Sequence, residues 1–521
     1  MRAIAVFCLA AAPLWAQPPA IRTGGVVNAA SRMPSMLPGG AIGRGALFDI
    51  VGVRLGTGDQ ATSVTVSAAG ARVRVPLLAV SPQRIAARMP AGAPLGDLSL
   101  TVTVDGAASP PYPLQVTRGN FGIFSRNREG WGPGRVDNVA PDRSRSANSL
   151  ANSARPGQAL VLAGTGLGDA RPEVWVGSRR AFVETVRRGT AGAAADEISF
   201  RLPPGTPEGC FVPLQVLEAG FASNTVTLSI HEGGGACEPP AVLPVAAWSG
   251  RTAGVVALSR TVRSPGARVS DEGLAVFAAH DAQDPALSPV LLIPPLGACA
   301  AYTGAITSGP QPPSSAGDAL MASAHTSGRD AGPRITVSQG SLRTPISRLE
   351  GAAGVYKRLL GEQGNGRPGR GGPLFLNPGG LVIAGTGGAD VGPFALSIPA
   401  PEPFSWENRD TIGAVDRRAG VTLRWKPPSE PGVVLLALTG VEPSGAAWGA
   451  CYCAAAGDAG SFTIPPAMLA NLPASQASAL SMPSLGLSWL PFANQRPLTA
   501  RGLDNGLAIS LYVETVEVQV R

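Results

Sequence analysis

The chain has 521 residues, too many for one hydrophobic core, because chains beyond about 250–300 residues usually divide into domains. Glycine (67) and proline (50) are abundant, yet 44% of the residues are hydrophobic. This combination argues against a solvated disordered coil and favours many short strands joined by turns. Only two of the 42 basic residues, Lys357 and Lys426, are lysines, and no more than two arginines follow one another, so clustered nucleic-acid recognition is not expected.

The charge is distributed unevenly. Residues 17–230 contain 21 arginines and 14 acidic residues, a net charge of +7, whereas residues 231–521 are close to neutral. Because the arginines are scattered, we expect most of them to solvate strand faces. A surface for acidic polysaccharide is the alternative.

The first residues predict export. MRAIAVFCLAAAPLWAQ has one arginine, a short apolar run and a small residue before Gln17, which is typical of a signal peptide spanning residues 1–16. No later segment has about 18 unbroken apolar residues, so no transmembrane segment is expected. We therefore expect a secreted protein of the extracellular space, the cell surface or the periplasm.

One pattern occurs twice. Each copy has a Pro-Gly stretch, an apolar strand (Leu47–Val53 or Ala159–Leu162), a Gly-rich turn (54–58 or 164–168) and a further strand (Val64–Val66 or Val174–Val176). Short strands separated by Gly and Pro turns predict small antiparallel sandwiches.

The expected fold class is all-β, with tandem immunoglobulin-like sandwiches followed by a further β-rich part. The predicted divisions are a first module at 24–120, a connecting segment at 121–152, a second module at 153–230, a linker at 231–240, a β-rich domain at 241–395 and a C-terminal sandwich-like domain at 396–521. The sequence leaves open whether residues 241–521 form one domain or two.

The repeated stretch resembles the IPT/TIG group of immunoglobulin-like domains. The order GGVVNAAS, AVSPQRIAARMP, FGIFSRNREGWGPGRVDN and RPGQALVLAGTGLG over residues 24–230 is also similar to an uncharacterised module of large secreted proteins from Acidobacteria of the Solibacter type. The resemblance implies a fold and an extracellular location, and it implies no reaction.

Fewer elements are predicted in the C-terminal half. We expect strands at Val255–Leu258, Leu274–Ala278, Val290–Ile293 and Ile335–Val337, a loop at 304–333 and a hairpin turn at Asp271-Glu272. PLFLN (373–377) is expected to be a strand before the strand of GLVIAG. Helices are expected at Ser347–Leu360 and Pro465–Leu472.

Five cysteines remain after the signal peptide. Cys210 opens the last part of the second module and Cys237 follows its end, so we expect a disulfide between them, as an exported protein permits. Cys299 is expected to pair with Cys451 or Cys453, and the sequence leaves this choice open. A metal site is not expected, because C-x-C is shorter than the usual knuckle spacing and no histidine is near.

No catalytic or cofactor motif is complete. GTGLG (164–168) and GTGGADVG (385–392) lack the lysine and the following helix of a phosphate loop, and G-x-S-x-G is absent. The three histidines, His231, His280 and His325, lie far apart. AAHDAQD, with His280, Asp281 and Asp284, is the most carboxylate-rich spot, and a capped turn explains it as well as Ca²⁺ or acid–base chemistry does.

We therefore expect a secreted, non-catalytic structural or adhesive protein without a cofactor, whose partner is an extracellular polysaccharide or a cell-surface protein. The alternative is a secreted carbohydrate-active enzyme with its site in residues 241–400. Low aromatic content (5%) disfavours the enzyme, because such sites usually combine aromatic side chains with a carboxylate pair.

Overall fold

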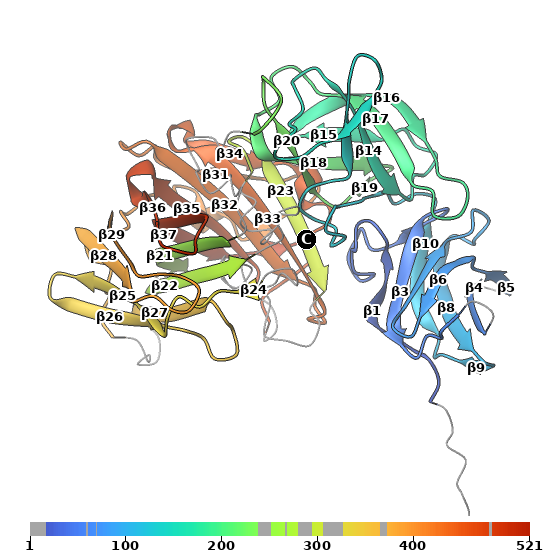
Figure 1. Ribbon diagram of the computed structural model, residues 1–521, viewed down its shortest axis with the longest axis horizontal. Coiled ribbons are helices and arrows are strands. Elements are labelled where there is room, and N and C mark those ends of the chain that lie inside the picture. The colour runs from blue at the N-terminus through green and yellow to red at the C-terminus, as the bar shows by residue number, and fades with distance from the viewer. Residues whose placement is uncertain are drawn as a thin grey trace, which may run out of the picture.

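The computed structural model describes residues 17–58, 61–68, 70–237, 252–265, 268–279, 294–305, 327–364, 372–478 and 482–521. Within these ranges the regular structure is almost entirely β-strand, with one short helix, α2 (Pro466–Leu469), and brief 3-10 turns. The predicted all-β class is confirmed. Figure 1 shows a blue sandwich, a teal-to-green sandwich and a larger yellow-to-red body. They are called module 1 (residues 20–117), module 2 (122–237) and the C-terminal body (252–521).

Module 1 is a sandwich of two sheets around one apolar core. In β4 (Thr62–Ala68), Val64 and Val66 are fully buried and alternate with less buried residues, as expected for a strand with one face on the core. The first sheet has the order β1 (Ala20–Asn28), β3 (Leu47–Val53), β7 (Arg84–Arg88) and β6 (Leu77–Ser81). The second has the order β2 (Ile42–Gly43), β10 (Tyr112–Thr117), β8 (Gly96–Val104), β4 and β5 (Ala71–Arg74), with β9 (Ala107–Ala108) beside β8.

Module 2 repeats this strand order. Its first sheet contains β13 (Arg145–Ala147), β12 (Val136–Val139), β14 (Ala159–Thr165), β17 (Asp196–Arg201) and β16 (Arg179–Arg187), with β11 (Gly122–Ile123) beside β14. Its second contains β15 (Glu173–Val176), β18 (Gly209–Glu218), β19 (Phe221–Ala222) and β20 (Val226–Ile230). The order β1-β3-β7-β6 of module 1 corresponds to β12-β14-β17-β16, so the repeat seen in the sequence is a repeat of topology.

One proline accounts for the main difference between the modules. In module 2, β16 pairs first with β15 and then with β17, so one strand passes from sheet to sheet. In module 1 the corresponding stretch is divided into β5, which pairs with β4, and β6, which pairs with β7. Pro76 lies at the division, and a proline has no N–H with which to continue a ladder.

The predicted connecting segment 121–152 belongs to module 2. Gly122 pairs with Thr165, β12 pairs with β14, and Phe121, Ile123 and Val136 lie in the core of module 2. The predicted strand Ala159–Leu162 extends to Thr165, because Thr165 pairs with Gly122 of this segment. Sequence composition suggested a connector because glycine, asparagine and arginine dominate this stretch, but its few apolar residues complete a sandwich.

The predicted boundary at residue 395 does not separate two domains. One sheet has the order β23 (Cys299–Ala305), β33 (Ala447–Ala456), β32 (Gly432–Val441), β35 (Ser484–Pro491), β37 (Asn505–Glu517), β21 (Thr252–Ser264), β22 (Arg268–Ala279) and β24 (Ser327–Gly328). Beside this path β27 (Val355–Gln363) pairs with β22 and β36 (Gln495–Pro497) with β37. Because β21 and β37 pair in parallel along their length, the two predicted domains share one sheet.

Two layers cover the same face of this sheet. The register aligns Val256 with Ala508, Val516 with Leu485, and Leu485 with Leu438, so these residues point to one side. One half of that side packs against a four-stranded sheet, β26 (Leu342–Ser347), β25 (Arg334–Gln339), β28 (Gly380–Gly385) and β29 (Phe394–Pro399). The other half packs against α2, β30 (Ala414–Val415), β31 (Val421–Arg424), β34 (Ser461–Ile464) and β38 (Gln519–Val520).

Three local predictions in the C-terminal body are wrong. Asp271-Glu272 is not a turn and lies within β22. Ser347–Leu360 is not a helix, because β26 ends at Ser347 and β27 begins at Val355, where pairing with β22 satisfies the backbone. Residues 373–377 are not a strand. The short helix predicted at 465–472 is present as α2, and Val290–Ile293 lies outside the described residues.

Asp271 joins the large sheet to the segment that precedes β28. Its carboxylate is fully buried and receives two hydrogen bonds of 2.8 Å from Arg260. Its Oδ2 also accepts the backbone N–H groups of Phe375 and Leu376, both at 2.7 Å. Residues 375 and 376 therefore bond to a side chain rather than to a neighbouring strand.

Replacing Asp271 with Ala should destabilise the protein by about 3–5 kcal/mol, because it leaves the guanidinium of Arg260 unpaired and two buried N–H groups without acceptors. Urea unfolding monitored by tryptophan fluorescence measures the change. Arg268→Ala, which removes an exposed ion pair with Glu362, is the control and should cost less than about 1 kcal/mol. Equal losses in both variants would contradict the role given to Asp271.

Candidate functional site

The two sandwiches meet around a buried arginine. Arg88, the last residue of β7, is 8% exposed and its guanidinium enters the loop between β16 and β17 of module 2. It donates hydrogen bonds to the carbonyls of Gly189, Gly192 and Ala194 at 2.5–2.9 Å, and to Gly45 of its own module at 2.6 Å. Burial lowers the pKa of Arg88, and the nearby Asp196 opposes that change.

Asp196 shapes the surface that Arg88 enters. Its two carboxylate oxygens accept the N–H groups of Leu167 and Gly189 at 2.9 and 2.8 Å. One side chain thus holds the Gly164–Gly168 turn and the loop whose carbonyls face Arg88. Burial raises the pKa of Asp196, and its backbone hydrogen bonds and Arg88 act in the opposite direction.

Two asparagines, Asn28 and Asn120, form further hydrogen bonds at the same joint. Asn28 accepts from the N–H groups of residues 30 and 31 and donates to the carbonyls of Asn120 and Thr165. Asn120 donates to the carbonyls of Gly39 and Ala41 at 2.7 and 2.6 Å. Asn28 belongs to GGVVNAAS and Asn120 directly precedes FGIF, so one motif of the sequence resemblance contributes to the joint and a second adjoins it.

The Gly-rich turn at 164–168 is closed off by this arrangement. A Cβ atom on Gly119 would lie 2.5 Å from the Cα of Gly168, so only glycine permits the two backbones to approach so closely. The turn therefore faces the joint and offers no loop to a phosphate. The second Gly-rich sequence, 385–392, closes around Asp330, whose carboxylate accepts the N–H groups of Gly332 and Ala389.

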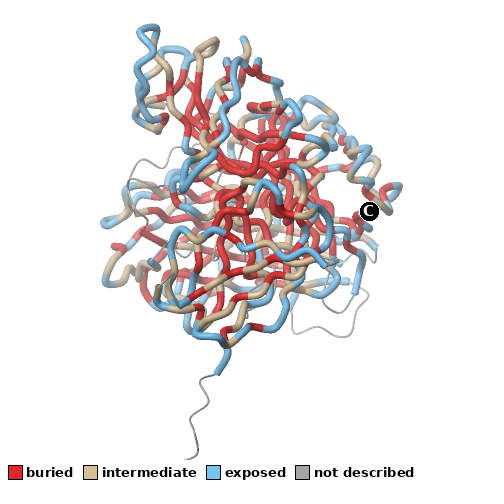
Figure 2. Tube along the Cα trace, turned by 90° about the vertical axis from the view of Figure 1, so that its right-hand side faces the viewer, coloured by how far each residue is buried: buried red, intermediate tan, exposed pale blue. Residues whose placement is uncertain are grey.

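The C-terminal body contacts both modules. Met33 and Leu37, in the segment between β1 and β2, pack on Ala447 of β33. Asn471 donates hydrogen bonds to the carbonyls of Ala222 and Ser223 in module 2 at 2.8 and 3.0 Å. Figure 2 shows buried backbone continuing through the region where the parts of the chain meet. The described parts of the chain therefore form one interlocked body.

Changing Arg88 to Lys should lower the stability by about 2–4 kcal/mol, because a lysine keeps the charge but cannot reach four separately placed carbonyls. The midpoint of urea unfolding of the full chain measures this loss. Arg74→Lys on exposed β5 is the matched control and should leave the midpoint unchanged. An unchanged midpoint for Arg88→Lys would show that the joint does not depend on the guanidinium.

A candidate binding site lies at the outer edge of module 1. The hairpin between β4 and β5 and the start of β8 line a shallow, open cavity of about 560 Å³. Arg72 and Asp97 supply opposite charges, and Ser67 and Ser99 supply hydroxyls. Because β5 is the edge strand opposite β2 in its sheet, this cavity lies away from the strand that contacts the joint.

The surplus positive charge lies mainly on module 1. Residues 17–120 contain nine arginines and four aspartates, whereas residues 121–230 contain twelve arginines and ten acidic residues. In module 2, Arg145, Arg187 and Arg201 form ion pairs with glutamates. Within the described part of module 1, Arg72 and Arg74 of β5 are exposed and form no ion pair, and Arg72 lines the cavity.

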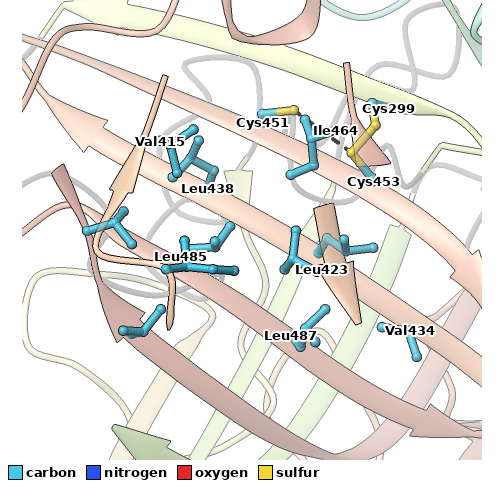
Figure 3. Close-up of a cluster of buried hydrophobic side chains, with 14 of the residues drawn as sticks. Cys299, Val415, Leu423, Val434, Leu438, Cys451, Cys453, Ile464, Leu485 and Leu487 are labelled. Atoms are coloured by element: carbon cyan, nitrogen blue, oxygen red, sulfur yellow. Dashed lines mark hydrogen bonds between the residues drawn. A yellow bond between two sulfur atoms is a disulfide. The ribbon is translucent and has the colours of Figure 1, made fainter. Parts of the chain in front are cut away.

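The structure contains two disulfides. Cys210 and Cys237, the pair expected from the sequence, are joined with a Cα separation of 5.4 Å. Cys299 is joined to Cys453, its cross-strand partner, which settles the choice that the sequence left open. Figure 3 shows the disulfide between Cys299 and Cys453 and the nearby Cys451 thiol among apolar side chains, including Leu438 and Ile464.

Cys451 remains a buried thiol. Its Sγ lies 4.0 Å from that of Cys453, and burial raises its pKa to about 12. The thiolate that could attack a disulfide or bind a metal is therefore scarce at neutral pH.

Of the other residues singled out in the sequence, the structure describes His231. The ring of His231 bonds the Gly234 carbonyl in the stretch that leads to Cys237. His280, Asp281, Asp284 and His325 lie outside the described residues, as does the predicted signal peptide 1–16. Sequence analysis missed Arg88, Asp196, Arg72 and Asp97, since no motif distinguishes them.

Removing the first disulfide by Cys210→Ser with Cys237→Ser should cost about 2–4 kcal/mol, because the bond closes a loop of moderate length in the unfolded chain. Thermal and urea unfolding of the oxidised protein measure the loss. Cys451→Ala is the control, since it removes one thiol and no bond. The same unfolding midpoint in the double variant and in the wild type would contradict a stabilising bond.

Comparison with known proteins supports the fold at the level of one domain. Residues 33–117 match the IPT/TIG domain, and no curated protein matches the chain. A surface glycan-binding protein from Prevotella bryantii is 14% identical over 34% of this chain and 35% of its own, with a TM-score of 0.14. SGBP-B from a xyloglucan utilization locus of Bacteroides uniformis is 15% identical over 66% and 86%, with a TM-score of 0.18.

A titin I9-I11 tandem is 5% identical over 69% of this chain and 93% of its own, with a TM-score of 0.13. The chain thus spans about a third of the first of these proteins, and TM-scores this low transfer no function. The narrower resemblance to acidobacterial secreted proteins stays a prediction. Among the described residues no helix is long and apolar enough to cross a membrane. Module 1 is the part that resembles IPT/TIG domains.

Proposed function

We propose that this protein is an exported, non-catalytic adhesive protein that binds acidic extracellular polysaccharide at the outer edge of module 1. The observation that carries the proposal is the open cavity lined by Arg72 and Asp97, on an edge strand that also holds the exposed Arg74. Guanidinium, carboxylate and hydroxyl groups are the partners that sugar hydroxyls need, and surplus arginine favours a ligand that carries carboxylate or sulfate.

The disulfides support an extracellular location. Two bonded cysteine pairs are typical of proteins that fold in an oxidising compartment. Adhesion also suits a closely packed body, because a closed joint presents the binding edge with a smaller entropy cost of ordering it.

Among the described residues of the region proposed for an enzyme, most carboxylates have partners elsewhere, whereas Asp281 and Asp284 lie outside those residues. In residues 252–400, Asp271 pairs with Arg260, Glu272 with Lys357, and Glu362 with Arg268. Asp330 binds backbone N–H groups, and Asp390 accepts the N–H of Asp330. Groups held in this way are poorly placed for acid–base chemistry, which supports a non-catalytic role.

The full chain should bind immobilised acidic polysaccharides more tightly than neutral ones, and the affinity should fall several-fold between about 50 and 200 mM salt, because exposed charges are screened over about 8–10 Å. Arg72→Ala should weaken binding about five- to tenfold, the loss of one exposed charge-assisted contact. Biolayer interferometry measures both effects.

Arg180→Ala, which removes an exposed arginine paired with Glu173 in module 2, is the control and should bind as the wild type does. Equal weakening in both variants would show that binding depends on the overall positive charge of the protein and not on the cavity. Release of reducing ends from the polysaccharide would contradict the non-catalytic role.

A further inference from the structure

The covalent link between the sandwiches runs directly over a buried glutamate. Residues 118–121 join β10 to β11, and the N–H of Asn120 bonds the carbonyl of Gly166 at 2.9 Å. A Cβ atom on Gly119 would lie 3.1 Å from Oε2 of Glu218, the last residue of β18. The linking segment thus forms the lid over this carboxyl group.

Glu218 is incompletely satisfied in the closed joint. The residue is 2% exposed, and its Oε2 accepts the N–H of Gly168 at 3.1 Å. Its Oε1 is buried without a hydrogen-bond partner. A buried carboxylate oxygen without a partner is costly, and protonation or hydration relieves that cost.

The charges around Glu218 come from three neighbouring elements. Arg188, after β16, lies near enough to favour the charged form of Glu218. Asp196 of β17 and Asp169, between β14 and β15, disfavour that form. Burial is the largest effect and raises the pKa of Glu218. Arg88 faces Asp196 from module 1 and stays cationic throughout the accessible pH range.

We propose that the joint is a proton-linked clasp, which closes more tightly as the pH falls because closing buries Glu218 under the segment that links the two modules. The geometry sets the direction. Opening moves residues 118–121 away and hydrates the carboxyl group, so the open joint has the lower pKa and releases the proton.

The closed joint is therefore favoured below the ordinary pKa of a glutamate, and the advantage is lost as the pH rises through the raised value. Asp196, whose pKa is also raised by burial, acts in the same direction where opening hydrates it. The hydrogen bonds from Arg88 to carbonyl groups contribute the part of the free energy of closing that does not depend on pH.

Hydrogen exchange of the full chain between pH 4 and 8 tests the proposal, with each rate divided by the intrinsic rate at that pH. As the pH rises, protection of residues 118–123 and 164–168 should fall, by about tenfold in total for each unit by which closing raises the pKa. Glu218→Gln keeps an acceptor for Gly168 and stays neutral, so its protection should depend less on pH than that of the wild type, with the remaining dependence due to Asp196.

Asp142→Asn, at an exposed position of module 2 between β12 and β13 and not among the charges that act on Glu218, is the control and should follow the wild type. Peptides from β32 and β33 report global unfolding and should not change. Constant protection in the wild type, or unaltered pH dependence in Glu218→Gln, would overturn the proposal. Glu218→Met provides a second neutral side chain if the glutamine variant does not fold, and the same results apply to it.

Discussion

The position of the two sandwiches depends on one buried guanidinium. Arg88 is held by four carbonyls rather than by a direct ion pair, and Asp196 acts on it through the loop that supplies three of them. A buried cation is tolerated only where its donors are matched. The loop between β16 and β17 must therefore keep its shape, and module 1 must keep its position against module 2.

This constraint decides which surfaces remain for binding. In isolated sandwiches the end loops are the usual binding sites, because they are exposed and carried on a rigid scaffold. Here the Gly164–Gly168 turn and the segment between β1 and β2 are used for contacts between parts of the chain. The free edge at β5, with Arg72 and Asp97, is the part of module 1 where polar groups remain beside a cavity.

The C-terminal body uses the same principle at Asp271. A buried carboxylate collects an arginine from the neighbouring strand and two backbone N–H groups from another layer. The residue that joins two parts is in each case a charged side chain that hydrogen-bonds backbone groups of the other part. Such a group fixes the relative position of the layers more specifically than apolar contacts do, because its partners must meet defined directions.

The sequence by itself determined the local pattern. Alternating apolar residues with Gly and Pro turns predict the strands around Val64 and Val174, because one face of each strand must be buried. Cys210 lies in the later part of module 2 and Cys237 at its end, so their pairing could be inferred from the order of elements. The helix expected at Ser347–Leu360 failed because pairing with β22 outweighed a weak local preference.

Only the tertiary structure decided which distant segments meet. The parallel pairing of β21 with β37 joins residues about 250 positions apart, and no local periodicity encodes a partner strand. For the same reason residues 121–152 read as a connector and Asp271-Glu272 as a turn. Arg88 and Glu218 look like ordinary surface residues in the sequence. Their roles arise because a second module covers them, and burial changes what a charge costs.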